Sequence, residues 1–293
     1  MTADPLTARF SKPGWLALAA IIAALYPIDT SAQELVTFNG APYRLGHIQE
    51  RLARESGEMP KPPESIEGYL SKPEGDGPFP AIVYLHGCGG LSEKTRQRMG
   101  HLLTGWGYVS LAVDSFSTRG IKEACNRLPE RRGDALGALS YLAKLPFVDP
   151  KRIAVVGSSQ GGIVTLQLGS TGSVPQARMF DIPEDLTFRA AVAYYPICSF
   201  ASDELNLPTL ILIGELDDWS PASDCERLMK RRAGRGAPVD LIVYPAAYHA
   251  FDVPALVDGR KFFGHWLKYD EDAATRSVQA MHDFLAAQLS QSP

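Results

Sequence analysis

The sequence is sparing in the residues that build metal sites. It has four cysteines and six histidines among 293 residues, and none of them stands in a Cys-x-x-Cys pair or a Cys/His metal-binding spacing, so no metal site is expected. An excess of one charge is lacking too. The formal net charge is −4, which does not favour nucleic acid or an anionic membrane as a partner. The sequence also contains no internal repeat and no low-complexity tract.

A hydrophobic run long enough for a transmembrane helix is missing from the N-terminus. The uncharged, mostly apolar stretch there covers residues 15–26, whereas a membrane-spanning helix needs about 20 residues. The stretch follows Arg9 and Lys12 and precedes the small residues 30–32. This pattern is typical of a secretory signal peptide with cleavage after Ala32, and a retained membrane anchor is the alternative.

We therefore expect a signal peptide at residues 1–32 and one domain over residues 33–293, which is a usual length for a single large α/β domain. The protein is expected to be exported to the periplasm or beyond, with no membrane attachment after cleavage. Its oligomeric state does not follow from the sequence.

Export would place the four cysteines in an oxidising compartment, where an even number favours disulfides. Four cysteines allow three pairings. We prefer Cys198–Cys225, because each follows a predicted strand at the same sheet edge, which leaves Cys88–Cys125 as the second bridge. Four buried free thiols are the alternative.

Predicted strands and helices alternate along the chain, which favours a mostly parallel sheet with helices on both faces. The predicted strands are residues 34–38, 65–70, 80–85, 108–113, 153–156, 190–195, 210–213 and 241–244. The predicted helices are residues 93–106, 130–145, 163–168, 221–232 and 273–289. Two basic clusters, Lys94–Arg98 and Arg127–Arg132, are interpreted as solvated helix faces rather than as polyanion sites.

A nucleophile is predicted at Ser159, in the pentapeptide Gly-Ser-Ser159-Gln-Gly between the apolar strand 153–156 and a helix. A serine on such a sharp turn is held in a strained backbone that lifts its hydroxyl to the top of the sheet. The flanking glycines let the turn close without side-chain clashes. An ordinary glycine-rich turn with an incidental serine is the alternative.

A base and an orienting acid are needed to activate a serine. Asp217 follows the buried strand 210–213 and is our candidate acid, with Asp218 and Glu215 as alternatives. Either aspartate could instead cap the following helix. His249 lies in the loop after the last predicted strand and is the candidate base.

Two backbone amides are expected to hold the oxyanion. One is the amide of Gln160, at the start of the helix that follows the serine. The other is the amide of Cys88, in the turn His86-Gly-Cys88-Gly-Gly after the strand 80–85. A plain glycine turn is the alternative, and Cys88 as a second nucleophile is the weaker one, because no base adjoins it.

These motifs together resemble the α/β-hydrolase superfamily and, within it, the dienelactone hydrolase family. The resemblance runs through most of residues 65–289. It implies an eight-stranded sheet, a Ser/Asp/His triad and no cofactor. The founding dienelactone hydrolases use cysteine as the nucleophile, whereas Ser159 stands at that position here, so their particular substrate does not carry over.

Two further features bear on the substrate. Arg119 follows the predicted strand 108–113, where it could bind a substrate carboxylate or pair with Asp114 or another acid. The loop 199–207 is too short for a large cap domain, which suggests an open cleft, although the loop 170–187 could cover it.

The sequence thus predicts a serine hydrolase that cleaves carboxylic esters of small molecules. A peptidase or amidase with the same triad is the first alternative. A catalytically idle binding protein on a hydrolase scaffold is the second.

Overall fold

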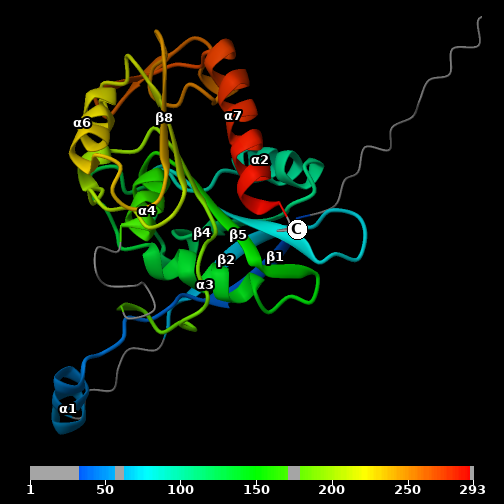
Figure 1. The fold of residues 1–293 in the computed structure, drawn as a ribbon, viewed down its shortest axis with the longest axis vertical. Coiled ribbons are helices and arrows are strands. Elements are labelled where there is room, and N and C mark those ends of the chain that lie inside the picture. Colours follow the sequence, from blue (N-terminus) through cyan, green and yellow to red (C-terminus); the bar gives the residue numbers. More distant parts are fainter. Residues whose placement is uncertain (1–32, 57–62, 171–178, 291–293) are drawn as a thin grey trace, which may run out of the picture. The chain divides into compact units, whose positions relative to one another are not determined.

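Eight strands form one sheet in the order β1-β2-β4-β3-β5-β6-β7-β8 (Figure 1). The computed structural model describes residues 33–56, 63–170 and 179–290. The predicted signal peptide lies outside these residues. The strands are β1 (Glu34–Asn39), β2 (Ser65–Ser71), β3 (Phe79–Leu85), β4 (Val109–Asp114), β5 (Val148–Ser158), β6 (Ala191–Tyr194), β7 (Thr209–Gly214) and β8 (Val239–Tyr244).

The sheet is mostly parallel, as the alternation of strands and helices predicted. Strand β2 pairs antiparallel with β1 and with β4, and every other pairing in the sheet is parallel. In a parallel sheet the carboxyl ends of the strands share one edge, and loops at that edge carry the functional groups. The segments after β3, β5, β7 and β8 are therefore brought together.

Helices follow most of the strands: α2 (Glu93–Gly105), α3 (Arg132–Leu142), α4 (Gln160–Gly169), α6 (Ala222–Arg232) and α7 (Glu271–Leu289). Two of them start at a side-chain cap. Ser92 Oγ accepts the Thr95 amide at the start of α2, and Asp270 Oδ1 accepts the Ala273 amide at the start of α7. Such caps satisfy amides that the first helical turn leaves unpaired.

The core lies on both faces of the sheet because the central strands are apolar on both sides. In β3, Ile82 and Tyr84 belong to the cluster that includes side chains of α2 and α7. Val83 and Leu85 point to the other face, where α3 packs. Helices α2 and α7 lie side by side in Figure 1, and the ring of Trp106 after α2 contacts His282 of α7 at 4.9 Å.

Several elements were not predicted from the sequence. Helix α1 (His47–Ser56) lies between the first two predicted strands, where no helix was predicted. The short hairpin β9 (Arg260–Phe262) and β10 (His265–Leu267) also escaped prediction, because three-residue strands carry too little periodicity. Three single-turn helices complete the described elements: η1 (Ser117–Arg119), η2 (Cys198–Phe200) and η3 (Pro254–Leu256). None of the helices in the described ranges is long and apolar enough to cross a membrane.

Both disulfides are present with the preferred pairing, Cys88–Cys125 and Cys198–Cys225. Cys198 lies in η2 after β6, whereas Cys225 lies inside α6 rather than directly after a strand. Two disulfides are consistent with a protein of an oxidising compartment.

The interpretation of the basic clusters as solvated helix faces holds only in part, because Lys94 and Arg127 are exposed whereas Arg98 and Arg131 are not. Arg98 donates to both the main-chain and side-chain oxygens of Asp252, each at 3.0 Å. Arg131 is only 1% exposed and lies just before α3. Sequence composition does not distinguish a solvated arginine from one that reaches a distant acceptor in the interior.

Candidate active site

Ser159 occupies a sharp turn between β5 and α4. Its backbone angles are φ 55° and ψ −116°, in a region that residues with a side chain rarely adopt. The turn is held at both ends, because the Ser159 amide donates to Tyr194 O (2.9 Å) and the Ile163 amide donates to Ser159 O (2.9 Å). Strain of this kind persists only where the surroundings fix it, and it often marks a functional position.

The glycines beside Ser159 are required by close approach of the backbone. A Cβ at Gly161 would lie 2.1 Å from Leu85 O at the end of β3. A Cβ at Gly157 would lie 2.2 Å from Gly161 O. The absence of these side chains lets α4 begin directly against β3, and so brings the turn after β3 next to Ser159.

Ser159, His249 and Asp217 form a continuous hydrogen-bonded chain. Ser159 Oγ lies 3.0 Å from His249 Nε2, and His249 Nδ1 lies 2.7 Å from Asp217 Oδ2. Both His249 and Asp217 are buried, with exposed fractions of 2% and 4%. A low-dielectric surrounding strengthens such bonds and excludes competing water. The predicted base thus contacts both the predicted nucleophile and the predicted acid.

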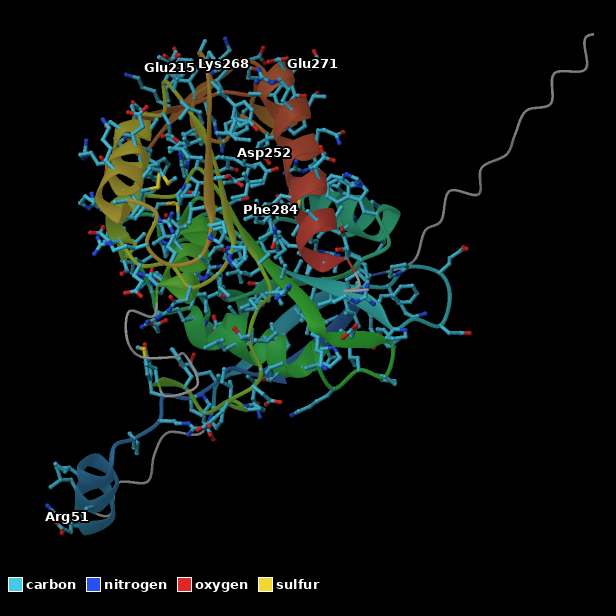
Figure 2. All side chains as sticks on the ribbon, in the orientation of Figure 1. Arg51, Glu215, Asp252, Lys268, Glu271 and Phe284 are labelled. Atoms are coloured by element: carbon cyan, nitrogen blue, oxygen red, sulfur yellow. A yellow bond between two sulfur atoms is a disulfide. The ribbon has the colours of Figure 1, made fainter. Side chains whose placement is uncertain are left out.

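Both carboxylate oxygens of Asp217 accept hydrogen bonds, and Asp217 does not cap the following helix, which starts without a side-chain cap. Its Oδ2 accepts from His249, while its Oδ1 accepts the amides of Trp219 (2.9 Å) and Ser220 (2.7 Å). The carboxylate therefore orients the imidazole and also fixes its own turn before α6. The two alternative acids point elsewhere. Asp218 Oδ1 accepts the Trp266 amide, and Glu215 Oε2 accepts the Ala246 amide (Glu215 is labelled in Figure 2).

Two aromatic rings that the sequence analysis missed pack against His249. The Tyr195 ring centroid lies 4.7 Å and the Trp219 ring centroid 5.2 Å from the imidazole. Trp219 directly follows Asp217 and Asp218, so its position beside a candidate acid could have indicated it. Tyr195 had no such signal. The loop of His249 is further supported by the hairpin, because the Lys268 amide donates to His249 O (3.3 Å).

The turn after β3 lies against the candidate nucleophile. A Cβ at Gly87 would be 3.4 Å from Ser159 Cβ, which places the adjoining Cys88 next to the serine. Gln160 is the first residue of α4, so its amide has no acceptor inside the helix. Among the backbone hydrogen bonds that the described residues make in turns, loops and caps, none is donated by the Cys88 amide or by the Gln160 amide. As far as the described part of the chain is concerned, both amides are thus available to a ligand oxygen.

A cavity of about 310 Å³ opens beside Ser159. Its walls are largely apolar, and its polar lining residues are Asn126, Arg127, Ser159, Gln160 and Ser220. It is lined by Cys88, Cys125, Asn126, Arg127, Leu128, Ser159, Gln160, Ile163, Ile197, Phe200, Trp219 and Ser220. A larger cavity of about 650 Å³ lies elsewhere, between β1 and α3, and includes none of the Ser159, His249 or Asp217 side chains.

Arg119 does not line the cavity at Ser159 and instead pairs with two acids, which is the alternative left open by the sequence. Its Nη1 and Nη2 donate to the two carboxylate oxygens of Asp134, each at 2.7 Å. Its Nε donates to Glu64 at 2.6 Å. Asp134 is buried, so its carboxylate needs the charge of the Arg119 guanidinium beside it. Asp114, the partner considered from the sequence, instead accepts a hydrogen bond from Ser117.

Comparison with known proteins identifies the family of this chain. A family model for the dienelactone hydrolase family matches residues 66–289. A Methylorubrum extorquens protein named "Putative carboxymethylenebutenolidase" is 24% identical over 199 residues, which cover 64% of this chain and 68% of that protein. Acylamino-acid-releasing enzyme 2 of Oryza sativa subsp. japonica is 29% identical over 153 residues, covering 50% of this chain and only 17% of that enzyme.

A solved structure gives the class of fold. The crystal structure of a "Putative Dienelactone Hydrolase" from Klebsiella pneumoniae superposes with a TM-score of 0.62 at 20% identity, covering 86% of this chain and 99% of that one. Together with the eight-stranded, mostly parallel sheet, this confirms the predicted α/β-hydrolase fold. The chain belongs to the dienelactone hydrolase family, and it is a hydrolase.

Proposed function

We propose that the protein hydrolyses carboxylic esters through an acyl-enzyme, with Ser159 as nucleophile, His249 as base and Asp217 as the orienting acid. The observation that carries this proposal is the pair of hydrogen bonds from Ser159 Oγ to His249 (3.0 Å) and from His249 to Asp217 (2.7 Å). A serine hydroxyl becomes a competent nucleophile when a positioned imidazole accepts its proton.

In the first half-reaction Ser159 Oγ attacks the ester carbonyl carbon while its proton passes to His249 Nε2. Asp217 Oδ2 stabilises the imidazolium and keeps its other nitrogen oriented. The carbonyl oxygen becomes an oxyanion that the amides of Cys88 and Gln160 bind. The C–O bond to the alcohol then breaks, and the imidazolium returns the proton to the leaving alkoxide.

In the second half-reaction water replaces the alcohol. His249 takes a proton from the water, whose oxygen attacks the acyl carbon, and the tetrahedral intermediate collapses with transfer of the proton to Ser159 Oγ. The products are a carboxylic acid and the free enzyme. Apolar walls supplied by Ile163, Ile197 and Phe200 favour substrates with an apolar acyl or alcohol group in the cavity.

The experiment compares Ser159→Ala with Ser158→Ala. The first variant should lose hydrolysis of short p-nitrophenyl esters by a factor of about 10⁵ or more and should no longer react with a fluorophosphonate probe. Ser158 instead contacts Tyr84 (3.3 Å between the hydroxyls), so its variant should keep wild-type turnover. Turnover that survives in Ser159→Ala would refute the proposal.

A peptidase or amidase is the second candidate, since a rice relative is named for release of acylamino acids. The same site could attack an amide, which has a poorer leaving group. Comparing kcat/KM for an ester and for the matching anilide decides between them. Faster turnover of the anilide would favour the peptidase, and absence of both activities with no probe labelling would favour an idle binding protein.

Export is proposed on the sequence of residues 1–32 and is supported by the two disulfides. Gln33, the first residue after the expected cleavage, donates from Nε2 to Ser71 Oγ (3.1 Å) and to Arg96 O (2.8 Å). The folded domain thus begins with its first mature residue anchored. Sequencing of the mature N-terminus should return Gln33, and retention of Met1 in the mature protein would contradict the proposed cleavage.

A further inference from the structure

Three segments meet at the two amides that the proposed mechanism uses for the oxyanion. They are the turn 86–90 after β3, the loop 120–131 between η1 and α3, and the start of α4. The loop 120–131 has no regular secondary structure of its own. Its conformation therefore depends on the contacts it makes with the other two segments.

The first contact joins the loop to the turn. Cys125 is disulfide-bonded to Cys88, the residue whose amide is one of the two oxyanion donors. Next to it, the Ala124 amide donates to Cys88 O at 2.9 Å. Cys88 is thus held by the loop through its side chain and its carbonyl at once, which leaves its amide as the group still free to bind a ligand.

The second contact joins the loop to the start of α4. Gln160 Nε2 donates to Ala124 O (3.0 Å) and to Arg127 O (2.8 Å), and Gln160 is only 6% exposed. Both N–H groups of the carboxamide are therefore used by the loop. Gln160 supplies the second oxyanion donor through its own amide, so the loop holds both donor residues.

The third contact joins Arg131, at the end of the loop, both to the turn after β3 and to the start of α4. Arg131 Nη1 donates to His86 O (2.9 Å) and to Gln160 Oε1 (3.3 Å). Arg131 is 1% exposed, and its guanidinium lies over the Phe116 ring at 5.1 Å. Burial lowers the pKa of Arg131 to about 10, which still leaves it cationic at neutral pH. Charge-assisted bonds in such a surrounding are strong and directional.

We propose that residues 124–131 form an oxyanion brace, in which the Cys88–Cys125 disulfide, the Gln160 carboxamide and Arg131 set the spacing between the Cys88 and Gln160 amides. This inference rests on the proposed function. Cys125, Arg131 and the Gln160 side chain are positioning groups, because they act on the oxyanion through the two amides. Oxyanion stabilisation acts on the transition state, so loss of the brace lowers kcat more than it raises KM.

The brace also makes activity sensitive to reductant. Cys88 and Cys125 both line the cavity beside Ser159, whereas Cys198 and Cys225 are each 0% exposed. A dithiol reductant therefore reaches the first bridge before the second. It donates two electrons and two protons, is itself oxidised to a cyclic disulfide, and leaves Cys88 and Cys125 as thiols.

The first test treats the purified full-length mature protein with increasing dithiothreitol, alkylates samples with iodoacetamide and counts the alkylated thiols by mass spectrometry. Turnover of a p-nitrophenyl ester is measured on the same samples before alkylation. We expect kcat to fall at least about tenfold as the species with two thiols forms, and to return after reoxidation. Unchanged kcat in protein whose Cys88 and Cys125 are shown to be reduced would overturn the proposal.

The second test uses variants and a matched control. Cys88→Ser/Cys125→Ser should lose kcat by about tenfold or more with a smaller change in KM. Cys198→Ser/Cys225→Ser removes a bridge of comparable span, 27 residues against 37, and should keep kcat within about twofold even though its melting temperature falls. Equal kcat values in the two double variants would show that the bridges act on stability alone, against the brace.

A third variant keeps the proposal testable if the cysteine variants fold poorly. Gln160→Met retains the backbone amide and removes the carboxamide that bonds the loop, so kcat should fall while both disulfides remain. Where Cys88→Ser/Cys125→Ser does fold, it can be combined with Gln160→Met. Because both changes break the same brace, kcat of the combined variant should fall by less than the product of the two separate factors. Fully multiplicative losses would contradict a shared brace. A wild type without esterase activity or probe labelling would instead refute the proposed function.

Discussion

Tyr195 packs its ring against the imidazole of His249, with 4.7 Å between the ring centroids. Its hydroxyl donates to Asp252 Oδ1 at 2.7 Å, and Asp252 also accepts from Arg98. Asp252, labelled in Figure 2, is buried. One face of the imidazole of the proposed base is therefore in contact with Tyr195, whose hydroxyl is held by the partly buried ion pair of Asp252 with Arg98.

Tyr195→Phe should lower stability while leaving the ring contact with His249. The variant leaves one oxygen of the buried Asp252 carboxylate without its donor, and such a loss costs about 1–3 kcal/mol. Burial raises the pKa of Tyr195 well above its ordinary value, so the hydroxyl donates throughout the neutral range. Urea denaturation should show the loss with kcat within about threefold of wild type. Unchanged stability would mean that Arg98 alone satisfies Asp252.

Asp217→Asn should reduce kcat by a factor of about 10⁴, as loss of the orienting acid does in serine proteases. The amide oxygen can still accept from Trp219 and Ser220, so the turn before α6 should remain folded. Asp218→Asn is the matched control, since Asp218 bonds the Trp266 amide and not His249. Steady-state kinetics on both variants checks this, and a comparable loss in Asp218→Asn would mean that the acid is misassigned.

Stability should fall as the pH drops below about 6.5, the ordinary histidine pKa. Burial, followed by the nearby Arg131 charge, holds the pKa of His86 well below that value in the folded protein. The unfolded chain therefore binds a proton that the folded one rejects, and stability rises with pH in this window. The slope from one such group reaches at most about 1.4 kcal/mol per pH unit.

The variant His86→Gln isolates this contribution. Glutamine does not titrate in this range, so the unfolding free energy of the wild type should fall relative to that of the variant as the pH drops from 7 to 5. Melting curves at several pH values measure it. A constant difference across that range would show that His86 keeps its ordinary pKa in the folded protein.

Gly161→Ala should destabilise the fold by about 3 kcal/mol or more, because the new Cβ would meet Leu85 O at 2.1 Å. Gly105→Ala in α2 is the control, since nothing lies within 4 Å of a Cβ there. Alanine in a helix is favoured over glycine by up to about 1 kcal/mol, so the control should be neutral or slightly stabilised. Equal thermal stability of the two variants would show that α4 can move away from β3.

The positions of Ser159, Asp217 and His249 could be predicted because each follows a parallel strand. Parallel strands end at one edge, so residues far apart in sequence are brought together by topology alone. The direction of a side chain after such a strand is not fixed in this way. Arg119 illustrates the limit, because Asp134, fifteen residues further on in α3, captures it.

The burial of Arg131 and the existence of the strands β9 and β10 could not be predicted from the sequence for a related reason. Arg131 stands in a basic cluster that is indistinguishable from a solvated surface until the positions of His86 O and Gln160 Oε1 are known. The hairpin of β9 and β10 is stabilised by its neighbours rather than by its own pattern, as the bond from Lys268 to His249 O shows. Both features arise from tertiary contacts that local periodicity does not record.

The backbone conformation at Ser159 (φ 55°) directs its side chain, whichever chemical element stands at the end of that side chain. The Cβ direction follows from the φ and ψ values that the bonds to Tyr194 O and from the Ile163 amide impose, and these contacts do not involve the hydroxyl. A cysteine at this position would have its Cβ in the same place, and its thiol would point toward His249 as the hydroxyl does. An exchange of oxygen for sulfur at this position therefore changes the reacting atom and leaves the backbone that directs it unchanged.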